Sequence, residues 1–512
     1  MMASMGERSA SPGPGAWLAR ARRLADPVFG VDLRSLGLFR IALASVLLFD
    51  LFDRSKSVAA HYTDSGTVPV SVLPLITGGA KLSIHAWLGH SLPAQWTLLA
   101  VSFGAGVALL LGFHTRVAAA VSWFLLASLQ VRNPLISWEG ADKLLRILLF
   151  WGVLAPLGAR FSLDARRARL RRAPGLPWPA PWLCTPATAL FVLQVAALYW
   201  ITGMAKTGNH WLDGQALAYV LRNDFFGTPL GAHARQFDGL LTVMSHTSRY
   251  LELLAAFLLF VPWRTWAFRL AAMSLFYAFH LGILFLMSVG FFSPISMTMW
   301  LPLLPSPVWE LAARLGGRPP PADARSGSRL RTPWTLEAPA AVLALFLIAS
   351  IGVKAVGFAT SASPLLPRPV DAAARLLRVR QHWPMFSPNP PLFDAWPVLR
   401  GRLADGRLVD PFAGGPVLED PPPSIGDYYP SFKWKIQFWW LVQESRDQRQ
   451  PHLLWGDLAR YLCDRWNATH PVEDRLARID LTLRLEVIQP DAEHDTVERW
   501  NLPGHACRPA AG

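Results

Sequence analysis

The sequence predicts a mainly α-helical, polytopic membrane protein with about nine spans, followed by a small extracytoplasmic α+β domain. Of the 512 residues, 52% are hydrophobic and only 16% are charged, whereas about a quarter of the residues in ordinary soluble domains are charged. The apolar residues are gathered in long stretches that short arginine clusters separate. Much of the predicted surface therefore faces lipid rather than water.

Composition divides the chain into three predicted parts. Residues 1–33 are polar and rich in proline and glycine, and they lack the apolar core and cleavage site of a signal peptide, so we expect a flexible cytoplasmic start. Residues 34–359 form the predicted membrane domain. Residues 360–512 have a soluble composition and form the predicted extracytoplasmic domain, with a flexible end.

The predicted spans follow from length, because crossing a hydrocarbon core of about 30 Å takes roughly 20 mostly apolar residues. Nine stretches are of adequate or marginal length: 36–52, 94–113, 116–131, 143–159, 186–205, 247–262, 265–287, 290–304 and 337–358. The fourth is weak because it contains Lys143 and Arg146, and the eighth because it contains Pro294 and Pro302.

Arginine clusters orient these spans, because basic loops remain in the cytoplasm. With nine spans, the clusters all fall on one side, and they contain Arg20, Arg22, Arg23, Arg34, Arg116, Arg166, Arg167, Arg169, Arg171, Arg172, Arg264, Arg269, Arg314, Arg318, Arg325, Arg329 and Arg331. We therefore expect a multi-pass protein of the cell (inner) membrane with a cytoplasmic N-terminus and an extracytoplasmic C-terminal domain. Because these loops explain the net charge of +14, nucleic acid is not an expected partner.

The C-terminal part shows strand and helix patterns. VLRGRLADGRLVDPF alternates as a pair of strands that turn at Asp405 and Gly406, and RIDLTLRLEVIQ reads as another strand. LLWGDLARYLCDRWNA predicts an amphipathic helix between them. The aromatic and basic run KWKIQFWWL, residues 433–441, fits either a membrane-surface segment or a buried strand or helix.

The three cysteines have no metal-binding spacing, so no metal is expected. Only Cys463 and Cys507 can pair, provided that the tail is exported.

The strongest candidate for chemistry lies in YWITGMAKTGNHWLDGQALAYVL, residues 199–221, which puts Lys206 at the extracytoplasmic end of the fifth span. A lysine here can simply cap the helix and reach the headgroups. Its neighbours favour a pocket, because Gly203 permits close backbone approach, Trp211 suits an interface and Asp213 begins a turn. A lysine in a poorly hydrated pocket becomes a neutral amine and can act as a base.

This segment resembles the conserved stretch of the vitamin K-dependent gamma-carboxylase superfamily and of its bacterial relatives, the horizontally transferred transmembrane domain (HTTM) family. Other blocks resemble the family in the expected order: LRSLGLFRIALASVLLFDLFDR with HYTDSGTVP (33–69), WEGADKLLRILLFWGVLAPLGARFSLD (138–164) and FHLGILFLMSVGFFSP (279–294). QHWPMFSPNPPLFDAWPVLRGRLADGR (381–407) and YLCDRWN (461–467) resemble the exported tail of bacterial members. The resemblance covers nearly the whole chain.

The resemblance implies that Lys206 is the catalytic lysine and that His280, inside the seventh span, is a second catalytic residue. From the residues alone, a buried histidine bonded to a neighbouring helix explains His280 equally well. The candidates for lining a substrate or quinone pocket are Tyr199, Thr202, Trp211, Asp213, Glu139, Asp142 and Arg40. Ion pairs between helices, or helix caps, are the alternative explanation for the charged residues Arg40, Asp50, Glu139, Asp142 and Glu252.

The implied chemistry uses reduced vitamin K or another quinol as cofactor. Lys206 deprotonates the quinol, oxygen adds, and the resulting base removes a γ-proton from a glutamate of an exported protein or peptide before carbon dioxide attaches. A water-poor membrane pocket protects such a base. The vitamin K enzyme has a histidine near the start of the fourth span where this chain has Ala141, so another quinone-linked lyase or oxidoreductase reaction, such as epoxidation, at the same lysine is a second version of this hypothesis.

A function of a different class is a non-catalytic membrane module that binds lipid or a partner protein. A transporter is disfavoured because the sequence shows no paired halves.

Overall fold

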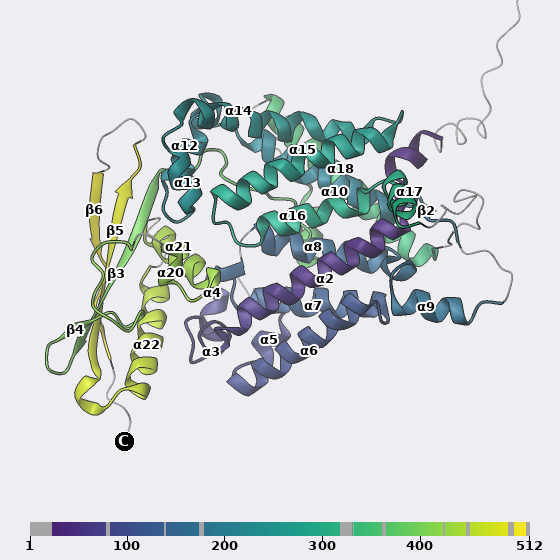
Figure 1. Cartoon of the computed structure of the whole chain (residues 1–512). Coiled ribbons are helices and arrows are strands. Elements are labelled where there is room, and N and C mark those ends of the chain that lie inside the picture. The colour runs from purple at the N-terminus through teal and green to yellow at the C-terminus, as the bar shows by residue number, and fades with distance from the viewer. Residues whose placement is uncertain are drawn as a thin grey trace, which may run out of the picture.

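The apolar stretches fold into a bundle of helices, and a small sheet lies at one end of it (Figure 1). The computed structural model describes residues 23–77, 82–137, 140–173, 179–317, 330, 332–360, 365–422, 425–446, 451–489 and 496–507. Helices account for most of this structure, as the predicted fold class requires.

Within the described residues, five helices are long and apolar enough to cross a membrane. They are α2 (Leu33–Ser55), α6 (Leu92–Leu111), α10 (Pro186–Ala205), α15 (Thr265–Leu286) and α18 (Trp334–Thr360). Each has at least 20 residues, enough for a hydrocarbon core of about 30 Å.

The other four predicted spans form shorter helices, so the number nine is not confirmed. They are α7 (Thr115–Arg132), α8 (Gly140–Leu154), α14 (Asp238–Leu254) with the 3₁₀ turn η4 (Ala255–Phe260), and α16 (Phe292–Trp300) with η5 (Leu301–Leu303). Helix α8 has only 15 residues and is largely buried, and α16 ends before Pro302. Helices α8 and α16 are largely buried, so their apolar side chains pack against neighbouring helices, which hydropathy alone does not distinguish from contact with lipid.

Helix α10 is the central element of the bundle, and it packs against α18 and α14. It begins at a capping box in which Thr185 and Thr188 satisfy each other's backbone N–H groups, and Pro186 occupies the first turn. Its side chains are buried along almost the whole length. A helix that is apolar on every side can be buried in this way without leaving polar groups unsatisfied.

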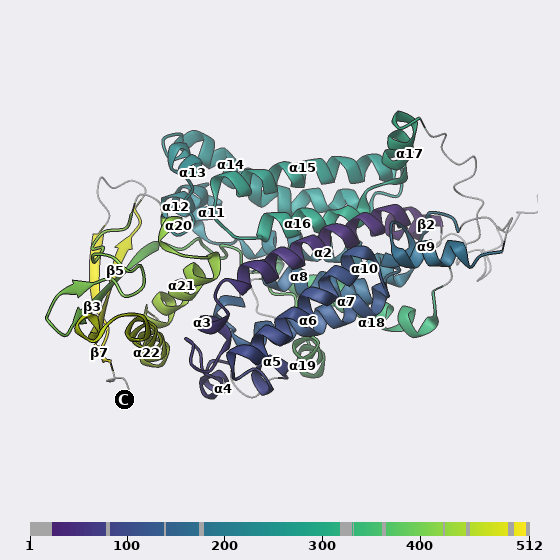
Figure 2. The same ribbon diagram turned by 60° about the horizontal axis from the view of Figure 1, so that its bottom comes forward.

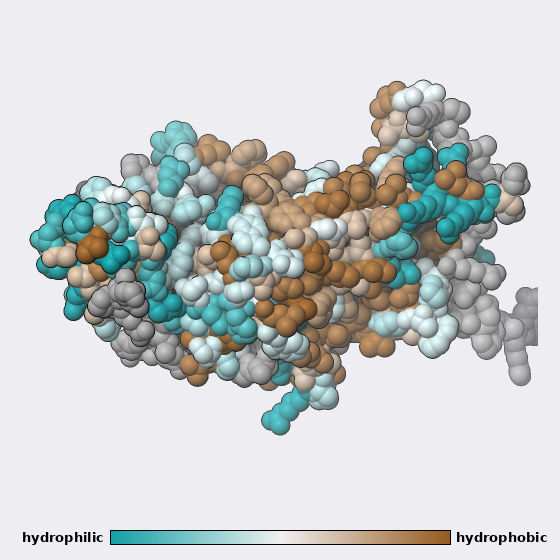
Figure 3. Space-filling view, turned by 90° about the horizontal axis from the view of Figure 1, so that it is seen from below, coloured by the Kyte–Doolittle hydropathy of each residue, from teal (hydrophilic) through white to brown (hydrophobic). Residues whose placement is uncertain are grey.

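On the face seen in Figure 3, hydrophobic residues gather over the middle of the molecule, and hydrophilic residues predominate toward both ends. Exposed apolar side chains of the bundle include Phe124 of α7, Val107 of α6 and Val342 of α18. Such a belt between polar ends is the surface expected of a protein that crosses a bilayer.

The C-terminal region contains a five-stranded antiparallel sheet in the order β4-β3-β5-β6, with β7 also paired to β5. The strands are β3 (Phe393–Leu403), β4 (Leu408–Val409), β5 (Leu476–Val487), β6 (Thr496–Asn501) and β7 (His505–Ala506). The predicted turn is confirmed, because β3 pairs with β4 around Gly406, whose φ of 90° favours glycine. Strand β5 occupies the predicted RIDLTLRLEVIQ run.

Helix α22 (Pro451–Thr469) is the predicted amphipathic helix, and a disulfide from Cys463 to Cys507 joins it to the end of the chain. The predicted domain boundary near residue 360 stays a prediction. One hydrophobic core contains both residues of the sheet region and residues of the helical region, such as Leu483 and Val68.

The run KWKIQFWWL forms part of a buried helix, α21 (Phe432–Arg446), between the sheet and the bundle. Lys433 is only 2% exposed, and its Nζ donates to Asp142 Oδ2 over 2.8 Å. The other oxygen of Asp142 accepts from Arg54, whose Nε also donates to Asp50 over 2.8 Å. Asp50, Arg54, Asp142 and Lys433 therefore form a buried ion network that links the C-terminal region to α2 and α8.

The short elements complete the fold. They are β1 (Val31–Asp32), β2 (Trp182–Leu183), η1 (Val70–Val72), η2 (Leu135–Ser137), η3 (Leu157–Ala159), η6 (Val472–Asp474), α3 (Val58–Tyr62), α4 (Leu73–Thr77), α5 (Ile84–Trp87), α9 (Leu163–Leu170), α11 (Asn209–Leu212), α12 (Ala216–Arg222), α13 (Pro229–Ala234), α17 (Ser306–Leu315), α19 (Arg368–Leu376) and α20 (Ile425–Tyr428).

Removing the central carboxylate of the ion network should destabilise the protein strongly. In Asp142→Asn, Arg54 and Lys433 stay buried, but the carboxylate that both of them contact is gone. We therefore expect the free energy of unfolding to fall by about 3 kcal/mol or more. Thermal unfolding in detergent micelles measures this loss. Glu419→Gln is the control, because its pair with Arg400 is partly exposed and should cost less than about 1 kcal/mol. Equal losses would contradict a structural role for the network.

Asp394 makes the stability of the C-terminal region depend on pH. It lies in β3 and accepts the backbone N–H of Asp224, and burial together with the Asp224 carboxylate raises its pKa from 3.8 to about 7. The folded state therefore binds this proton more tightly than the unfolded chain, so the stabilisation is present at low pH and is lost as pH rises from about 4 to about 7.

We expect Asp394→Asn, which stays neutral, to flatten this decline by up to a few kcal/mol, since one pKa unit is worth about 1.4 kcal/mol. Thermal unfolding recorded from pH 4 to pH 7 tests this expectation. Glu419→Gln should keep the slope of the wild type. An unchanged slope in Asp394→Asn would show that this carboxyl group does not control the pH dependence.

Candidate functional site

A cavity of about 600 Å³ lies where the helical bundle meets the C-terminal region. Helices α10, α14 and α15 supply one wall, which includes Tyr199, Glu252 and His280. The opposite wall comes from residues 384–393 and from aromatic side chains of α21, among them Trp439. Most of the lining is apolar or aromatic, so the few polar groups are conspicuous as sites for recognition or chemistry.

Lys206 lies in this cavity wall at the C-terminal cap of α10. Its side chain reaches α14, where Nζ donates to Glu252 Oε2, and it also stands 4.5 Å from the ring centre of Trp211. Both members of the ion pair are only 4% exposed. The close approach depends on Gly203, because a Cβ there would lie 3.0 Å from Leu253 Cγ and 3.1 Å from Glu252 Cβ.

The ion pair has a definite chemical consequence. A buried ammonium or carboxylate without a partner is very costly, whereas the pair carries no net charge. Moving one proton from Lys206 Nζ to Glu252 Oε2 also gives an arrangement without net charge. The pair can therefore exist as two ions or as an amine and a carboxylic acid, and the second form contains a base.

His280 and Tyr199 form a second polar group in the cavity wall, and Trp300 bonds to it from outside the lining. His280 Nε2 lies 2.8 Å from the hydroxyl of Tyr199, which accepts a hydrogen bond from Trp300 Nε1 over 3.0 Å. His280 is fully buried, and among the described residues its Nδ1 has no hydrogen-bond partner. If the Tyr199 hydroxyl donates to Nε2, the neutral ring carries its proton on Nδ1 and retains one unused donor.

The structure brings together part of the predicted site. Lys206, His280, Tyr199 and Trp211 all line the cavity. Thr202 lies just behind this wall, with its hydroxyl bonded to Leu198 O and 3.7 Å from Met385 Sδ.

The remaining predicted pocket residues lie elsewhere. Asp213 is exposed at the end of α11, and Asp142 belongs to the buried ion network. Arg40 is buried near the opposite end of the bundle, where it donates to the carbonyl groups of Leu109, Leu110 and Phe161. Glu139 lies outside the described residues.

Sequence reasoning missed three features of the cavity. It treated Glu252 only as one of the membrane-level charges, although Glu252 is the direct partner of Lys206. It did not assign Lys143, or the segment 384–393, to the site. The signal that could have found this segment is its density of proline and aromatic residues in PMFSPNPPLF, which suits a rigid apolar wall.

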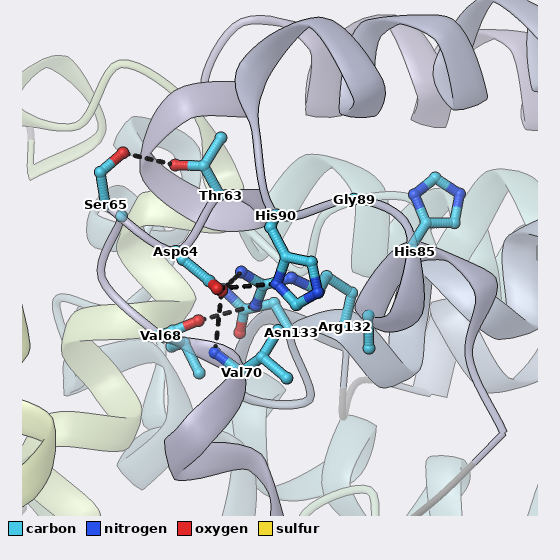
Figure 4. Close-up of polar contacts among 12 residues, drawn as sticks. Thr63, Asp64, Ser65, Val68, Val70, His85, Gly89, His90, Arg132 and Asn133 are labelled. Atoms are coloured by element: carbon cyan, nitrogen blue, oxygen red, sulfur yellow. Dashed lines mark hydrogen bonds and ion pairs between the residues drawn. The ribbon is translucent and has the colours of Figure 1, made fainter.

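The motif HYTDSGTVP forms a separate polar cluster outside the cavity lining (Figure 4). Asp64 accepts from the backbone N–H of Val70 over 3.0 Å and from Arg132 over 3.2 Å, and its other oxygen lies 2.8 Å from His90 Nδ1. Arg132 also donates to Val68 O over 2.7 Å. The motif therefore fixes a loop between helices.

This loop supports the C-terminal region directly. Arg460 of α22 donates to Gly66 O over 2.8 Å, and the Thr67 hydroxyl bonds to Gln437 of α21 over 3.2 Å. The cluster positions the elements that close the cavity.

Comparison with models of protein families matches residues 30–309 to the HTTM domain. The matched region contains Lys206, Glu252 and His280, whereas the wall formed by residues 384–393 and α21 lies beyond it. Searches among curated proteins and solved structures found no match.

Proposed function

The chain belongs to the HTTM domain family, and we propose that this membrane protein is an enzyme in which Lys206 is the base for a quinol-dependent reaction. The observation that carries the proposal is a buried lysine–glutamate pair that faces a large apolar cavity beside a histidine with an unused ring nitrogen. Such a pair costs stability unless the surroundings hold it in place, and in a cavity wall it supplies both an acceptor and a donor of protons.

The cavity fits a quinol by size and by chemistry. Its volume of about 600 Å³ lies within the range usual for small-ligand sites. Phe279, Phe386 and Trp439 offer aromatic contacts to a fused ring. His280 Nδ1 and the Lys206–Glu252 pair provide the polar groups that hydroxyl oxygens on such a ring require. A quinol bound there would supply an acidic hydroxyl group and the electrons that oxygen accepts, a redox reaction that amino-acid side chains alone do not provide.

The residues of the chain divide the proton chemistry between them. Transfer of a proton from Lys206 Nζ to Glu252 Oε2 frees the amine lone pair, which then accepts the proton of a hydroxyl group in the cavity. The resulting ammonium returns to the favourable position beside the Trp211 ring. Tyr199 and Trp300 fix the His280 ring, so His280 can donate from Nδ1 to a developing oxyanion.

Carboxylation of a glutamate substrate is the version of this reaction that family resemblance favours. Ala141 lines the cavity at the point where the vitamin K enzyme has a histidine, and that position is therefore without an acid or base. Oxidation of a quinol at Lys206, including epoxidation, needs no residue at Ala141. Product analysis must accordingly follow quinone epoxide and carboxylated peptide separately.

The proposed topology has nine crossings, with the N-terminus in the cytoplasm and the sheet outside. Helix α9, which carries the Arg166 cluster, and the sheet lie at opposite ends of the molecule (Figure 1). The disulfide between Cys463 and Cys507 also supports an extracytoplasmic tail of an inner-membrane protein, because disulfides persist in oxidising compartments.

A non-catalytic module is the second candidate function. The observation in its favour is that Glu252 already satisfies the charge of Lys206, as an ion pair with a purely structural role would require. In this case, the cavity binds a lipid or a partner segment without chemical change.

Replacement of Lys206 separates the two functions. We expect Lys206→Gln to lower turnover at least about 100-fold, because a general base contributes roughly 10²–10⁴-fold, and we expect Lys206→Arg to be equally inactive, because a guanidinium cannot supply a free amine. The assay uses purified protein in lipid nanodiscs with reduced vitamin K, labelled bicarbonate and a glutamate-containing peptide.

Two controls accompany this assay. Lys56→Gln changes an exposed lysine and should retain activity. The double variant Lys206→Gln/Glu252→Gln removes both buried charges, so it should fold even if the single variant does not, and it should also be inactive. Full activity in folded Lys206→Arg would refute the enzymatic proposal and favour the module.

The topology can be tested by cysteine labelling in a Cys184→Ser background. A membrane-impermeant maleimide should label Arg499→Cys in intact cells and should label Arg169→Cys only after permeabilisation. These exposed positions lie in β6 and α9, which the proposed topology puts on opposite sides of the membrane. The reverse pattern would overturn the orientation, and labelling of both in intact cells would overturn the crossing of the membrane between them.

A further inference from the structure

A cluster of basic side chains lies where α8, the end of α18 and the segment 377–383 come together. We call it the basic cluster, and its members are Lys143, Arg146, Lys354, Arg378, Arg380 and His382. Only Lys143 is shared with the cavity lining. The cluster therefore needs an explanation separate from the chemistry at Lys206.

Direct contacts hold the cluster together. Lys143 Nζ donates to His382 O over 2.5 Å and stands 5.3 Å from the ring centre of Trp383. Arg146 Nε donates to Arg378 O over 3.3 Å. Lys143 and Arg146 of α8 thus bind the backbone of the segment 377–383, which itself carries positively charged side chains. The like charges therefore lie close together.

Few negative charges oppose this arrangement. Asp371 of α19 is shared by Arg375 and Arg380, with distances of 2.9 Å to each. Asp142 of α8 attracts Arg146 but is already bound by Arg54 and Lys433. In the described part of the chain, no acidic side chain forms an ion pair with Lys143, Lys354 or Arg378.

Arg378 shows the cost of the arrangement most clearly. Its φ of 57° is the left-handed conformation common just after the end of a helix, because the N–H groups of Arg378 and Val379 bond to carbonyl groups in the last turn of α19. Its Nε is buried and, among the described residues, has no hydrogen-bond partner. A buried guanidinium donor without a partner is costly, and an anionic ligand would use both the charge and the donor.

The electrostatic environment of His382 supports this interpretation. Burial, together with repulsion from Lys143, Lys354 and Arg380, lowers its pKa from 6.5 to about 4. His382 is therefore neutral at physiological pH. An anion bound among these cations would reduce the repulsion and offer an acceptor to the cluster.

The position of the cluster indicates the source of the anion. Lys354 lies near the end of α18, in a stretch where Val356 and Phe358 are exposed. Leu365, just before α19, and Leu376, the last residue of α19, are 83% and 70% exposed. Figure 2 shows α19 at the edge of the bundle, below α6. Apolar side chains beside cations at the end of a span are characteristic of a membrane interface.

We propose that the basic cluster binds the phosphate group of an anionic phospholipid in the outer leaflet, while the exposed side chains of α18 and α19 contact its acyl chains. Arg378 and Arg380 are suited to paired hydrogen bonds with phosphate oxygens, and Lys143 and Lys354 contribute charge. The lipid phosphate compensates the charge that the described acidic residues leave unopposed.

The experiment measures binding of phosphatidylglycerol, phosphatidylcholine and inorganic phosphate to the purified full-length protein in detergent, by native mass spectrometry at fixed ionic strength. We expect phosphatidylglycerol to bind at least about tenfold more tightly than the other two. Lys354→Gln/Arg380→Gln, which changes two exposed side chains, should lose about tenfold or more of this affinity, because each cation near an anionic headgroup contributes several-fold. Arg378→Gln should weaken binding similarly.

Arg402→Gln/Arg499→Gln is the matched control, because it removes the same charge from exposed positions of the sheet and should leave the affinity unchanged. Equal binding of phosphatidylglycerol and phosphatidylcholine would overturn the proposal, as would an equal loss in the control. Binding of inorganic phosphate as tight as that of phosphatidylglycerol would overturn the lipid as the source of the anion. Because the assay requires no turnover, its outcome is independent of the reaction proposed for Lys206.

Discussion

The structure depends on the pairing of charges that are withdrawn from water where the helical bundle meets the C-terminal region. Asp142 is surrounded by Arg54 and Lys433, and both of its oxygens are occupied. Lys206 and Glu252 are equally buried, but they face a cavity. In both places a buried charge requires a partner of opposite charge. At Asp142 this pairing holds two regions of the protein together, whereas at Lys206 the pair remains accessible to a ligand.

The sequence predicted the elements whose signal is local. Apolar length identified the five long helices, and the alternating run around Gly406 identified a strand pair. It could not give the number of spans, because α8 is apolar through contact with α2, α7, α10 and α16. The motif around Lys206 identified this residue as a candidate. Its ion pair with Glu252 could not be predicted from the sequence, because the pair depends on how α14 packs against the end of α10. The buried position of α21 likewise depends on Asp142, far away in the sequence.

The C-terminal region supplies part of the candidate site. Residues 384–393 and α21 form a cavity wall that the helices alone do not provide. Their placement depends on the ion network at Asp142 and on the loop around Asp64, which bonds to α21 and α22. Changes in this region can therefore alter the shape of the cavity without changing the helices that carry Lys206 and His280.

The two walls of the cavity come from different parts of the chain, so ligand specificity and proton-transfer chemistry can vary independently. The residues proposed to move protons come from α10, α14 and α15, which lie inside the region that matches the HTTM domain. Most of the opposite wall lies outside that region, and its contacts are apolar. Proton transfer needs a fixed geometry between donor and acceptor, whereas apolar contacts tolerate changes of shape at a cost that depends mainly on volume. One set of helices could thus retain its lysine–glutamate pair while different C-terminal regions select different ligands for it.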